Sequence, residues 1–158
     1  MDGKIVPPVA NFDFTIDDLS SIAQTELYTY WLKIKADKLM PSRDDFAPTD
    51  LPKILPFISM ENVVYDPIRF QIRLVGTQTS SLRNSVGMFL DDIPGTEHII
   101  AMLKEMVELK KPYFYTSNIN WDERKYKTYS SLILPFSEDG ENVTLCMACH
   151  HSLGVSRY

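Results

Sequence analysis

The sequence predicts an α+β domain in which about five strands form an antiparallel sheet, with helices on one face and an extra helix at the N-terminus. The first observation is the order of patterns: a helical stripe, two strands, a helical segment and three further strands. The second is that short turns separate the last three strands, which makes them antiparallel neighbours. The first two strands reach them through a segment too long and too helical to be a turn, so helices pack against the sheet. At 158 residues the chain is most simply one domain.

The part of the chain before the sheet begins with a lead-in and a helix. Residues 1–14 hold two prolines and no periodicity, so we expect a flexible segment. A helix is predicted from Thr15 to about Asp37, because Thr15 and Asp18 match a capping box. Its apolar stripe packs on the sheet of the same domain or forms a dimer helix, and it comprises Ile16, Leu19, Ala23, Leu27, Tyr30 and Ile34.

A proline-rich connector follows this helix. Residues 39–56 contain four prolines, which exclude a long helix. One short helical turn is expected near Pro48, and Arg43 either pairs with Asp44 or Asp45 or belongs to a solvated or locally braced loop. The predicted division is therefore a lead-in at 1–14, the helix and connector at 15–56, and the sheet-bearing core at 57–158.

The core opens with a hairpin and a sharp break. Strands are predicted at 57–65 and 69–75, joined by the turn signal Asp66-Pro67. Gly76 ends the second strand at a point where the backbone turns sharply or approaches a neighbour closely. An irregular, partly helical segment then runs to Gly95.

The second half of the core is a helix followed by three strands. Thr96 caps a helix that Pro112 stops. Glu138-Asp139-Gly140 is a strong hairpin signal between the last two strands. The last strand has a near-continuous apolar character, which is typical of a central strand buried on both faces. The three strands are predicted at 113–121, 126–136 and 143–151.

Composition and charge exclude several classes of protein. Hydrophobic residues make up 44% and charged residues 23% of the chain, as in ordinary globular domains. The net charge is −5 and no Lys/Arg-rich block occurs, so a nucleic-acid partner is not expected. No apolar run is long enough for a membrane span. The N-terminus lacks the pattern of a signal peptide, so we expect a cytoplasmic protein with its two cysteines reduced.

Several short motifs, in order, resemble those of the PAS superfamily, and in particular those of short, stand-alone bacterial PAS-like proteins. The motifs are Tyr30-Trp31, Leu39-Met40-Pro41-Ser42-Arg43, Leu51-Pro52, Ile54-Leu55-Pro56, Arg73-Leu74-Val75-Gly76-Thr77, Asp91-Asp92 and Leu134-Pro135-Phe136-Ser137. This resemblance implies a sensory or regulatory module, without catalytic activity, that binds a small molecule between the sheet and the helical segment or a protein on the sheet's outer face. The identity of a cofactor or partner is not implied.

The implied pocket lies between the sheet and the helical region at 77–107. The same side chains would also fill an ordinary core. Arg73 and Thr77 would hydrogen-bond a ligand or tie the strand to the helix. The candidate lining comprises Ile72, Arg73, Leu74, Thr77, Met88, Phe89, Met102, Met106, Tyr115, Tyr129 and Leu132.

Two further groups suggest metal or haem chemistry. Cys146-Met147-Ala148-Cys149-His150 has the C-x-x-C-H spacing of covalent haem attachment and offers zinc ligands. On a strand, residues three apart point to opposite faces, so the two cysteines would not converge on one group. His98, in the first turn of the helix that precedes the third strand, is a candidate metal ligand. Solvated or buried structural roles are the alternatives for both groups.

The function expected from these observations is a non-enzymatic sensor that works by a population shift, alone or as a homodimer through its N-terminal helix. A ligand-free interaction adaptor and a haem or redox protein that uses His98 or residues 146–150 are the alternatives. No motif for a hydrolase, a phosphate-binding loop or a zinc protease occurs.

Overall fold

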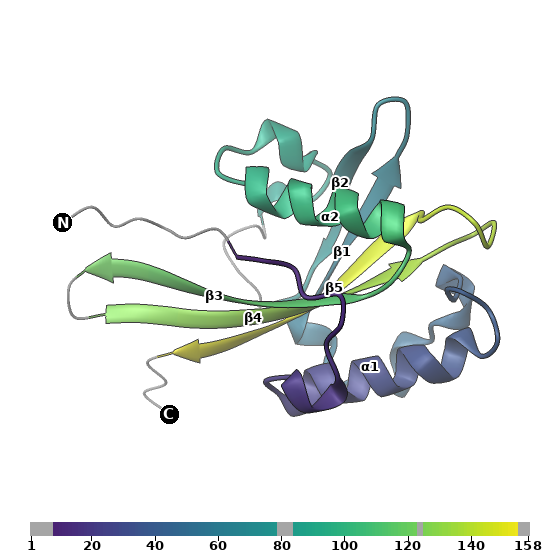
Figure 1. The fold of residues 1–158 in the computed structure, drawn as a ribbon, viewed down its shortest axis with the longest axis horizontal. Coiled ribbons are helices and arrows are strands. Elements are labelled where there is room, and N and C mark those ends of the chain that lie inside the picture. The colour runs from purple at the N-terminus through teal and green to yellow at the C-terminus, as the bar shows by residue number, and fades with distance from the viewer. Residues whose placement is uncertain (1–7, 79–83, 123–124, 155–158) are drawn as a thin grey trace.

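The computed structural model describes residues 8–78, 84–122 and 125–154. It confirms the predicted antiparallel sheet, whose five strands are ordered β2-β1-β5-β4-β3 (Figure 1). β5 is central and buried on both faces, as its apolar sequence predicts. The strands are β1 (Ile58–Val64), β2 (Arg69–Val75), β3 (Tyr113–Asp122), β4 (Lys125–Phe136) and β5 (Leu145–Gly154).

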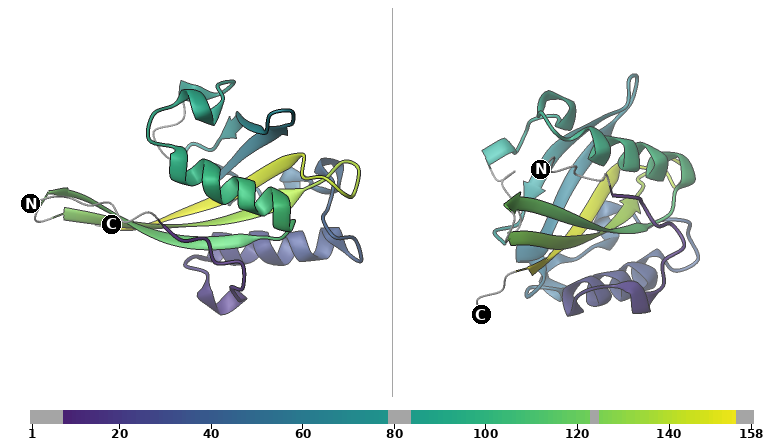
Figure 2. Two further views of the ribbon diagram at one scale, coloured as in Figure 1. Left: turned by 45° about the horizontal axis from the view of Figure 1, so that its top comes forward. Right: turned by 60° about the vertical axis from the view of Figure 1, so that its left-hand side comes forward.

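The two long helices lie on opposite faces of the sheet (Figures 1 and 2). Helix α2 (Glu97–Leu109) covers the face that we call the α2 face, and its buried residues are Met102, Leu103, Met106 and Val107. Helix α1 (Ile22–Lys35) covers the other, the α1 face, with Leu27 and Trp31 buried. The extra N-terminal helix therefore packs on the sheet of its own chain, and its use as a dimer helix stays a prediction. No described helix is long and apolar enough to cross a membrane.

Helix α1 starts later than predicted. Thr15 and Asp18 do form a capping box, but it closes only a 3-10 turn at Ile16–Asp18. The chain is extended at Leu19, and Ser21 caps α1 by accepting a hydrogen bond from the Gln24 backbone N–H at 3.1 Å. Ser20 and Ser21 favour caps over helix interiors, because their hydroxyls compete for backbone groups.

Two buried polar side chains fix α1 on the α1 face. The Gln24 Nε2 group donates to the Ser130 hydroxyl at 3.1 Å and to the Cys149 carbonyl oxygen at 3.2 Å. The Trp31 Nε1–H donates to the Pro135 carbonyl oxygen at 3.0 Å. Because these groups are buried, their loss would leave unpaired polar atoms in the core.

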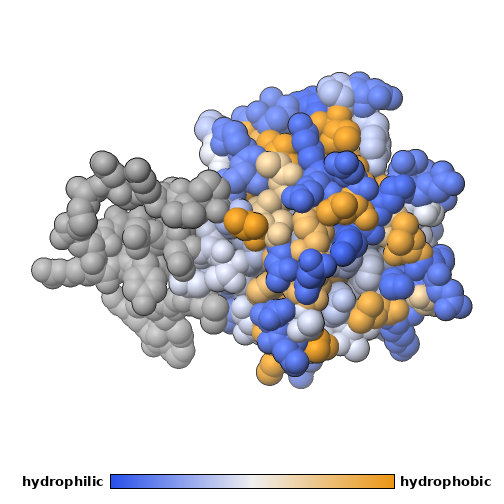
Figure 3. Space-filling model, viewed as in Figure 1, coloured by the Kyte–Doolittle hydropathy of each residue, from blue (hydrophilic) through white to orange (hydrophobic). Residues whose placement is uncertain are grey.

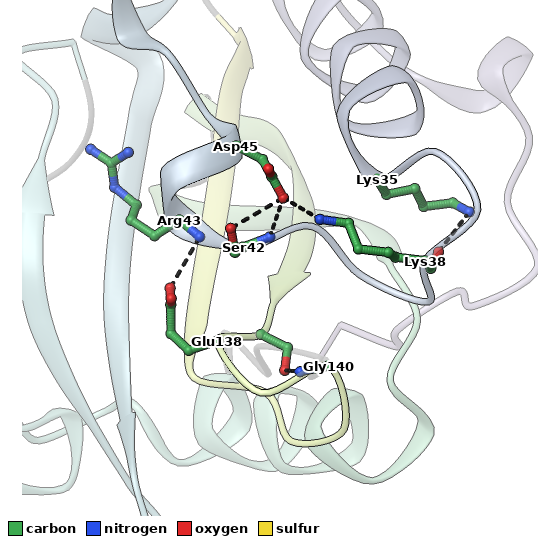
Figure 4. A network of polar contacts seen from close by, with 8 residues as sticks. Lys35, Lys38, Ser42, Arg43, Asp45, Glu138 and Gly140 are labelled. Carbon is green, nitrogen blue, oxygen red and sulfur yellow. Dashed lines mark hydrogen bonds and ion pairs between the residues drawn. The ribbon is translucent and has the colours of Figure 1, made fainter.

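Of the alternatives open for Arg43, the structure shows a locally braced loop and not a pair with a neighbouring aspartate (Figure 4). Three 3-10 turns, at Arg43–Asp45, Pro48–Asp50 and Leu55–Phe57, replace the single turn predicted for the connector. Asp45 stands at the third position of the first turn, where its carboxylate accepts the Ser42 N–H at 2.8 Å and pairs with Lys38. Arg43 instead donates through Nη1 to the Phe46 carbonyl oxygen at 3.0 Å.

Glycine at position 76 is required by a close approach, as predicted. A Cβ atom there would lie 2.4 Å from the Pro56 carbonyl oxygen and 2.7 Å from that of Ile58. The predicted hairpin after β4 is also confirmed. The Asp139 carboxylate accepts the backbone N–H groups of Glu141 and Asn142 at 2.8 and 2.7 Å.

The N-terminal segment from residue 8 to residue 14 runs along the edge of β3. Asn11 and Phe114 exchange two backbone hydrogen bonds of 2.8 and 3.0 Å. Phe12 packs against the core of the α2 face and Phe14 against that of the α1 face. This part of the expected lead-in is thus held by the sheet.

Candidate ligand site on the α2 face of the sheet

The α2 face changes from apolar to polar along the strands. Paired residues of antiparallel strands share a face, so the register defines rows across the sheet. One row runs through Ile72, Glu61 and Cys146, and the next joins Ser59, Ala148, Ile133 and Tyr113. The following row joins His150, Ser131 and Tyr115. The first rows belong to the core beneath α2, whereas the third row is polar.

The polar row forms a hydrogen-bonded network centred on His150. The His150 Nε2 atom lies 2.8 Å from the Ser59 hydroxyl oxygen, and its Nδ1 atom lies 2.7 Å from that of Ser131. The hydroxyl of Tyr115 also hydrogen-bonds to Ser131, which partly offsets the rise that burial causes in the pKa of Tyr115, to about 12. Strands β1, β3, β4 and β5 thus each contribute one residue to a continuous polar network.

Histidine 150 is neutral in this network at physiological pH. Burial lowers its pKa to about 4, because the imidazolium ion loses its hydration inside the protein. A neutral imidazole has one N–H donor and one acceptor nitrogen, so the two serine hydroxyls bond it in complementary senses. Both hydroxyls are thereby held by the ring of His150.

Glu61 is the most unusual residue of the face. It is 9% exposed, and burial alone, with no hydrogen bond, shifts the pKa of its carboxyl group; among the described residues only Arg43 Nε is a fully buried side-chain polar atom without a partner, so the Glu61 oxygens keep some contact with solvent. Burial raises the pKa of Glu61 to about 8, so the protonated form predominates at neutral pH. Buried acids are rare unless they are paired, and each unpaired group is a reason to look for a missing partner.

Aromatic rings line the neighbouring part of the face. The Tyr113 and Tyr115 rings stack with their centroids 6.2 Å apart, and Tyr115 meets Tyr129 edge-on at 6.3 Å. Phe12 packs on Tyr113 at 5.2 Å. Burial is the main cause that raises the pKa of Tyr113 and Tyr115, and strands β5 and β4 lie between these tyrosines and Glu61.

A hollow of 440 Å³ opens beside this face, between β2 and α2. Its rim carries Arg69, whose Nε lies 3.0 Å from Asp91 Oδ2 and whose guanidinium carbon stacks 3.9 Å from the centre of the Phe89 ring. Phe70 is 1% exposed, so it forms the floor of the hollow. The lining residues are Pro67, Ile68, Arg69, Phe70, Asp91, Ile100 and Lys104.

The structure brings five of the predicted pocket residues to the α2 face: Ile72, Met102, Met106, Tyr115 and Tyr129. It places Leu132 on the α1 face, in the core beneath α1. Thr77 is exposed, as are Leu74 at 41% and Met88 at 43%. Arg73 donates to Asn62 Oδ1 at 3.4 Å, and Phe89 lies beneath Arg69.

The position of Leu74 has a clear cause. Leu74 stands two residues after Ile72 and four after Phe70, a spacing that predicts a shared face of the strand. The register of β1 and β2 shifts between Met60 and Glu61, so Leu74 pairs with Met60, which faces α1, while Ile72 pairs with Glu61. Such a β-bulge moves the residues beyond it to the other face of the strand.

The residues that sequence reasoning missed are Ser59, Glu61, Ser131 and His150. They come from three strands that are far apart in the sequence, so only the register unites them. The available signal was polarity within segments that are otherwise strongly apolar: one glutamate in Ile58–Val64 and one serine pair in the middle of β4.

The cysteine motif does not converge on one group. Cys146 faces the α2 core and Cys149 the α1 core, as residues three apart on a strand must. Both are buried, and burial raises the pKa of each thiol, that of Cys149 to about 12. His98 stands in the first turn of α2. Among the described residues, no three His, Cys, Asp or Glu side chains are grouped so that they could hold a metal ion.

The fold and the position of the site define a domain in which a sheet and a covering helix enclose a candidate pocket. The profile of the PAS domain family matches residues 19–148, which is most of the chain. The chain therefore belongs to the PAS domain family, and the resemblance noted in its sequence is confirmed. No curated protein matches it. PAS domains are generally sensory or regulatory modules without catalytic activity.

Proposed function

We propose that this protein is a sensory or regulatory module that binds a small molecule between the α2 face and α2. The observation that carries the proposal is Glu61, an acid buried in an apolar core without a described partner. The network of Ser59, Ser131 and His150 lies in the neighbouring rows of the same face and adds polar groups to it. Pockets that combine apolar walls with a few polar groups are typical ligand sites.

A purely structural role explains these polar groups poorly. An acid without a partner loses its hydration and gains no hydrogen bond in return, which costs about 1–3 kcal/mol even in its neutral form. An apolar residue at position 61 would pack against Ile72 and Cys146 without this cost. A ligand that supplies the missing hydrogen-bond partner accounts for the acid.

The two faces of the sheet are linked in a way that suits signalling. His150 belongs to the polar network on the α2 face, and Cys149, the residue before it, accepts a hydrogen bond from Gln24 of α1 on the other face. Ser131 and Ser130 of β4 make the same two connections. A ligand that moves β4 and β5 by rearranging this network would therefore shift the population of α1 positions.

The surface seen in Figure 3 does not have the character of a protein-binding patch over α2. Apolar and strongly polar residues are interspersed over the part of that view where Figure 1 places α2. Protein-binding surfaces more often present a continuous apolar patch with a polar rim.

Native mass spectrometry of the full chain, purified without denaturant, tests the proposal. We expect an additional mass on the folded protein, and an absorbance spectrum of the same sample identifies haem or flavin if either is the ligand. A matched pair of variants locates the site: Met106→Phe enlarges a side chain on the α2 face, and Met147→Phe makes the same change on the α1 face. Both methionines are 0% exposed.

The two variants separate the possible results. Loss of the additional mass from Met106→Phe, with retention by Met147→Phe, supports a ligand on the α2 face. Equal retention or equal loss in two folded variants refutes that location. The opposite result is a measured mass equal to that of the polypeptide alone, with no thermal stabilisation by any member of a small-molecule library. It refutes ligand binding and leaves the interaction adaptor as the better hypothesis.

A further inference from the structure

We propose that Arg43 binds the carboxylate group of an acid from outside the chain, at a second site on the connector between α1 and β1. Arg43 lies next to Phe46, which belongs to the core of the α1 face, so this site is separate from the candidate pocket on the α2 face. The inference therefore goes beyond the function proposed above and stands without it. It follows from an unpaired donor, from the fixed position of the guanidinium group and from the charges around it.

The guanidinium group of Arg43 carries a buried donor that no described residue satisfies. Its Nε atom is, in the described part of the chain, the one fully buried side-chain nitrogen or oxygen without a hydrogen-bond partner. The group also forms no ion pair with a described acid. Buried donors without an acceptor and charges without a counter-ion are rare in folded proteins, because each loses hydration without compensation. An acidic acceptor from outside the chain accounts for both features.

Contacts on two sides hold Arg43 in place. Its Nη1 atom donates to the Phe46 carbonyl oxygen at 3.0 Å, and its Cζ atom lies 5.5 Å from the centre of the Phe46 ring, within the range of a cation–π contact. The Arg43 backbone N–H donates to Glu138 Oε1 at 3.1 Å. Phe46 is itself packed edge-on against Tyr30 and Phe136. A group that is held in this way loses little conformational freedom on binding, which favours affinity.

The unused edge of the guanidinium group matches a carboxylate. In arginine the Nε–H and one N–H of Nη2 point the same way, so together they can donate to the two oxygens of one carboxylate. Phe46 occupies Nη1, which lies on the other side of the group. Figure 4 shows the side chain pointing away from both acids drawn beside it, Asp45 and Glu138. Arg43 as a whole is only half-buried, so an acid can reach this edge after a small displacement of the atoms that cover Nε.

The charges around Arg43 favour an acid with a single charge. Asp45 stands in the same 3-10 turn, where its carboxylate is paired with Lys38. The Glu138 carboxylate accepts the Arg43 backbone N–H, and Asp139 follows it in the chain. These acids would repel a dianion such as sulfate more strongly than a carboxylate. The ligand class is therefore a carboxylic acid, either a small molecule or an acidic side chain of another protein.

Nuclear magnetic resonance of the arginine Nε–H groups in the full chain tests the proposal directly. The Arg43 signal is the one that is missing from the spectrum of Arg43→Lys. At about pH 6, where acetate is ionised, sodium acetate should move this signal downfield in a saturable way, because a charge-assisted hydrogen bond deshields the proton. Sodium sulfate should bind at least about tenfold more weakly. Sodium chloride at the same ionic strength should leave the signal in place.

A second probe distinguishes the two sources of the acid. It is a short peptide with one aspartate and with both ends blocked, so that its side chain carries the only carboxylate. Binding of either probe supports the carboxylate class. Tighter binding of acetate indicates a small acid, and tighter binding of the peptide indicates an acidic side chain of a protein.

Two conservative variants separate recognition by the edge from recognition by charge. Arg43→Lys keeps the positive charge but lacks the Nε–H edge, so it should bind acetate about tenfold more weakly or worse, which corresponds to the loss of one charge-assisted hydrogen bond. Arg73→Lys, at an exposed arginine of β2, is the matched control and should keep the affinity of the natural protein. The increase in unfolding temperature with acetate concentration measures both affinities.

Three results overturn the proposal. In the first, the Arg43 Nε–H signal of the free protein already has the downfield shift of a bonded donor, because an acceptor within the chain then satisfies it. In the second, neither probe moves the signal at hundred-millimolar concentration. In the third, Arg43→Lys binds acetate as tightly as the natural protein. The Nε–H signal is followed in the unmodified chain, so this test does not depend on the folding of a variant or on a ligand at the α2 face.

Discussion

Replacing Glu61 by glutamine should make the protein more stable at neutral pH. Glutamine has nearly the shape of a protonated glutamate and never ionises. The pKa of Glu61 is raised from its ordinary value of 4.5 to about 8, so folding favours the protonated acid. The unfolded chain binds fewer protons than the folded chain between these values, and the stability of the natural protein therefore falls as pH rises through this window.

The magnitude follows from the width of the window. Each unit of pKa difference corresponds to about 1.4 kcal/mol, so ionisation of Glu61 in the unfolded chain destabilises the folded protein by about 3 kcal/mol at pH 7. We expect Glu61→Gln to exceed the natural protein by this amount at pH 7. The difference should shrink to below about 1 kcal/mol at pH 5, because that pH lies only half a unit above the ordinary pKa of 4.5 in the unfolded chain.

His150 acts in the opposite sense and shapes the curve of the natural protein. Its pKa falls to about 4 in the folded state, so the unfolded chain binds more protons between about pH 4 and pH 6.5 and stability rises with pH there. The contributions of Glu61 and His150 nearly cancel up to about pH 6.5. Above it only that of Glu61 remains, and the natural protein should lose about 2 kcal/mol between pH 6.5 and pH 8.

Urea unfolding followed by circular dichroism, at half-unit steps from pH 5 to pH 8, measures these curves. The window excludes Asp45, Asp91 and Asp139, whose pKa values are lowered and which titrate below it. Glu26→Gln serves as the surface control and should run parallel to the natural protein. A Glu61→Gln protein that is less stable at pH 7, or a difference that does not grow with pH, would show that Glu61 is ionised and paired in the folded state.

Three further substitutions test the fold. Gly76→Ala should destabilise the protein by about 1–3 kcal/mol in urea unfolding, because the added Cβ overpacks against the Pro56 carbonyl oxygen at 2.4 Å; an unchanged midpoint would contradict the close approach. Trp31→Phe should cost about 1–3 kcal/mol, since the buried Pro135 carbonyl oxygen loses its donor at 3.0 Å, and a neutral effect would mean that water replaces that donor. Asp139→Ala should lower stability at neutral pH and have no effect once pH falls below the lowered pKa of this carboxyl, because backbone N–H donors bind its ionised form; a loss that persists in acid would assign it to the turn geometry instead.

Most of the fold could be predicted because its signals are local. Each strand carries its own apolar pattern, Pro112 ends α2, and the continuous apolar character of β5 indicates its central place in the sheet. The start of α1 could not be predicted as well, because Thr15 and Ser21 both offer a cap and the sequence pattern does not show where the chain is extended between them.

The site could be predicted only in part, because it depends on register. Met102 and Met106 lie on one face of α2 by helical spacing alone, and this face packs on the sheet as expected. Leu74 and Leu132 were misplaced for a different reason. An alternating pattern predicts that neighbouring residues of a strand point to opposite faces, but it does not say which of them points toward α1 and which toward α2. One bulge after Met60 decides the orientation of Leu74.

Glu61 escapes notice in the sequence because both faces of its strand are buried at that point. The first four residues of β1 are all buried, so an acid among them has no exposed face to occupy. Alternation with Met60, which faces α1, places Glu61 on the α2 face, beside Ile72 and Cys146, where the neutral glutamine is expected to be more stable. Residues that reduce the stability of their own fold are concentrated at functional sites, since selection retains them for another reason. The stability gained in Glu61→Gln would thus measure directly how much the fold gives up to keep an acid at this buried position.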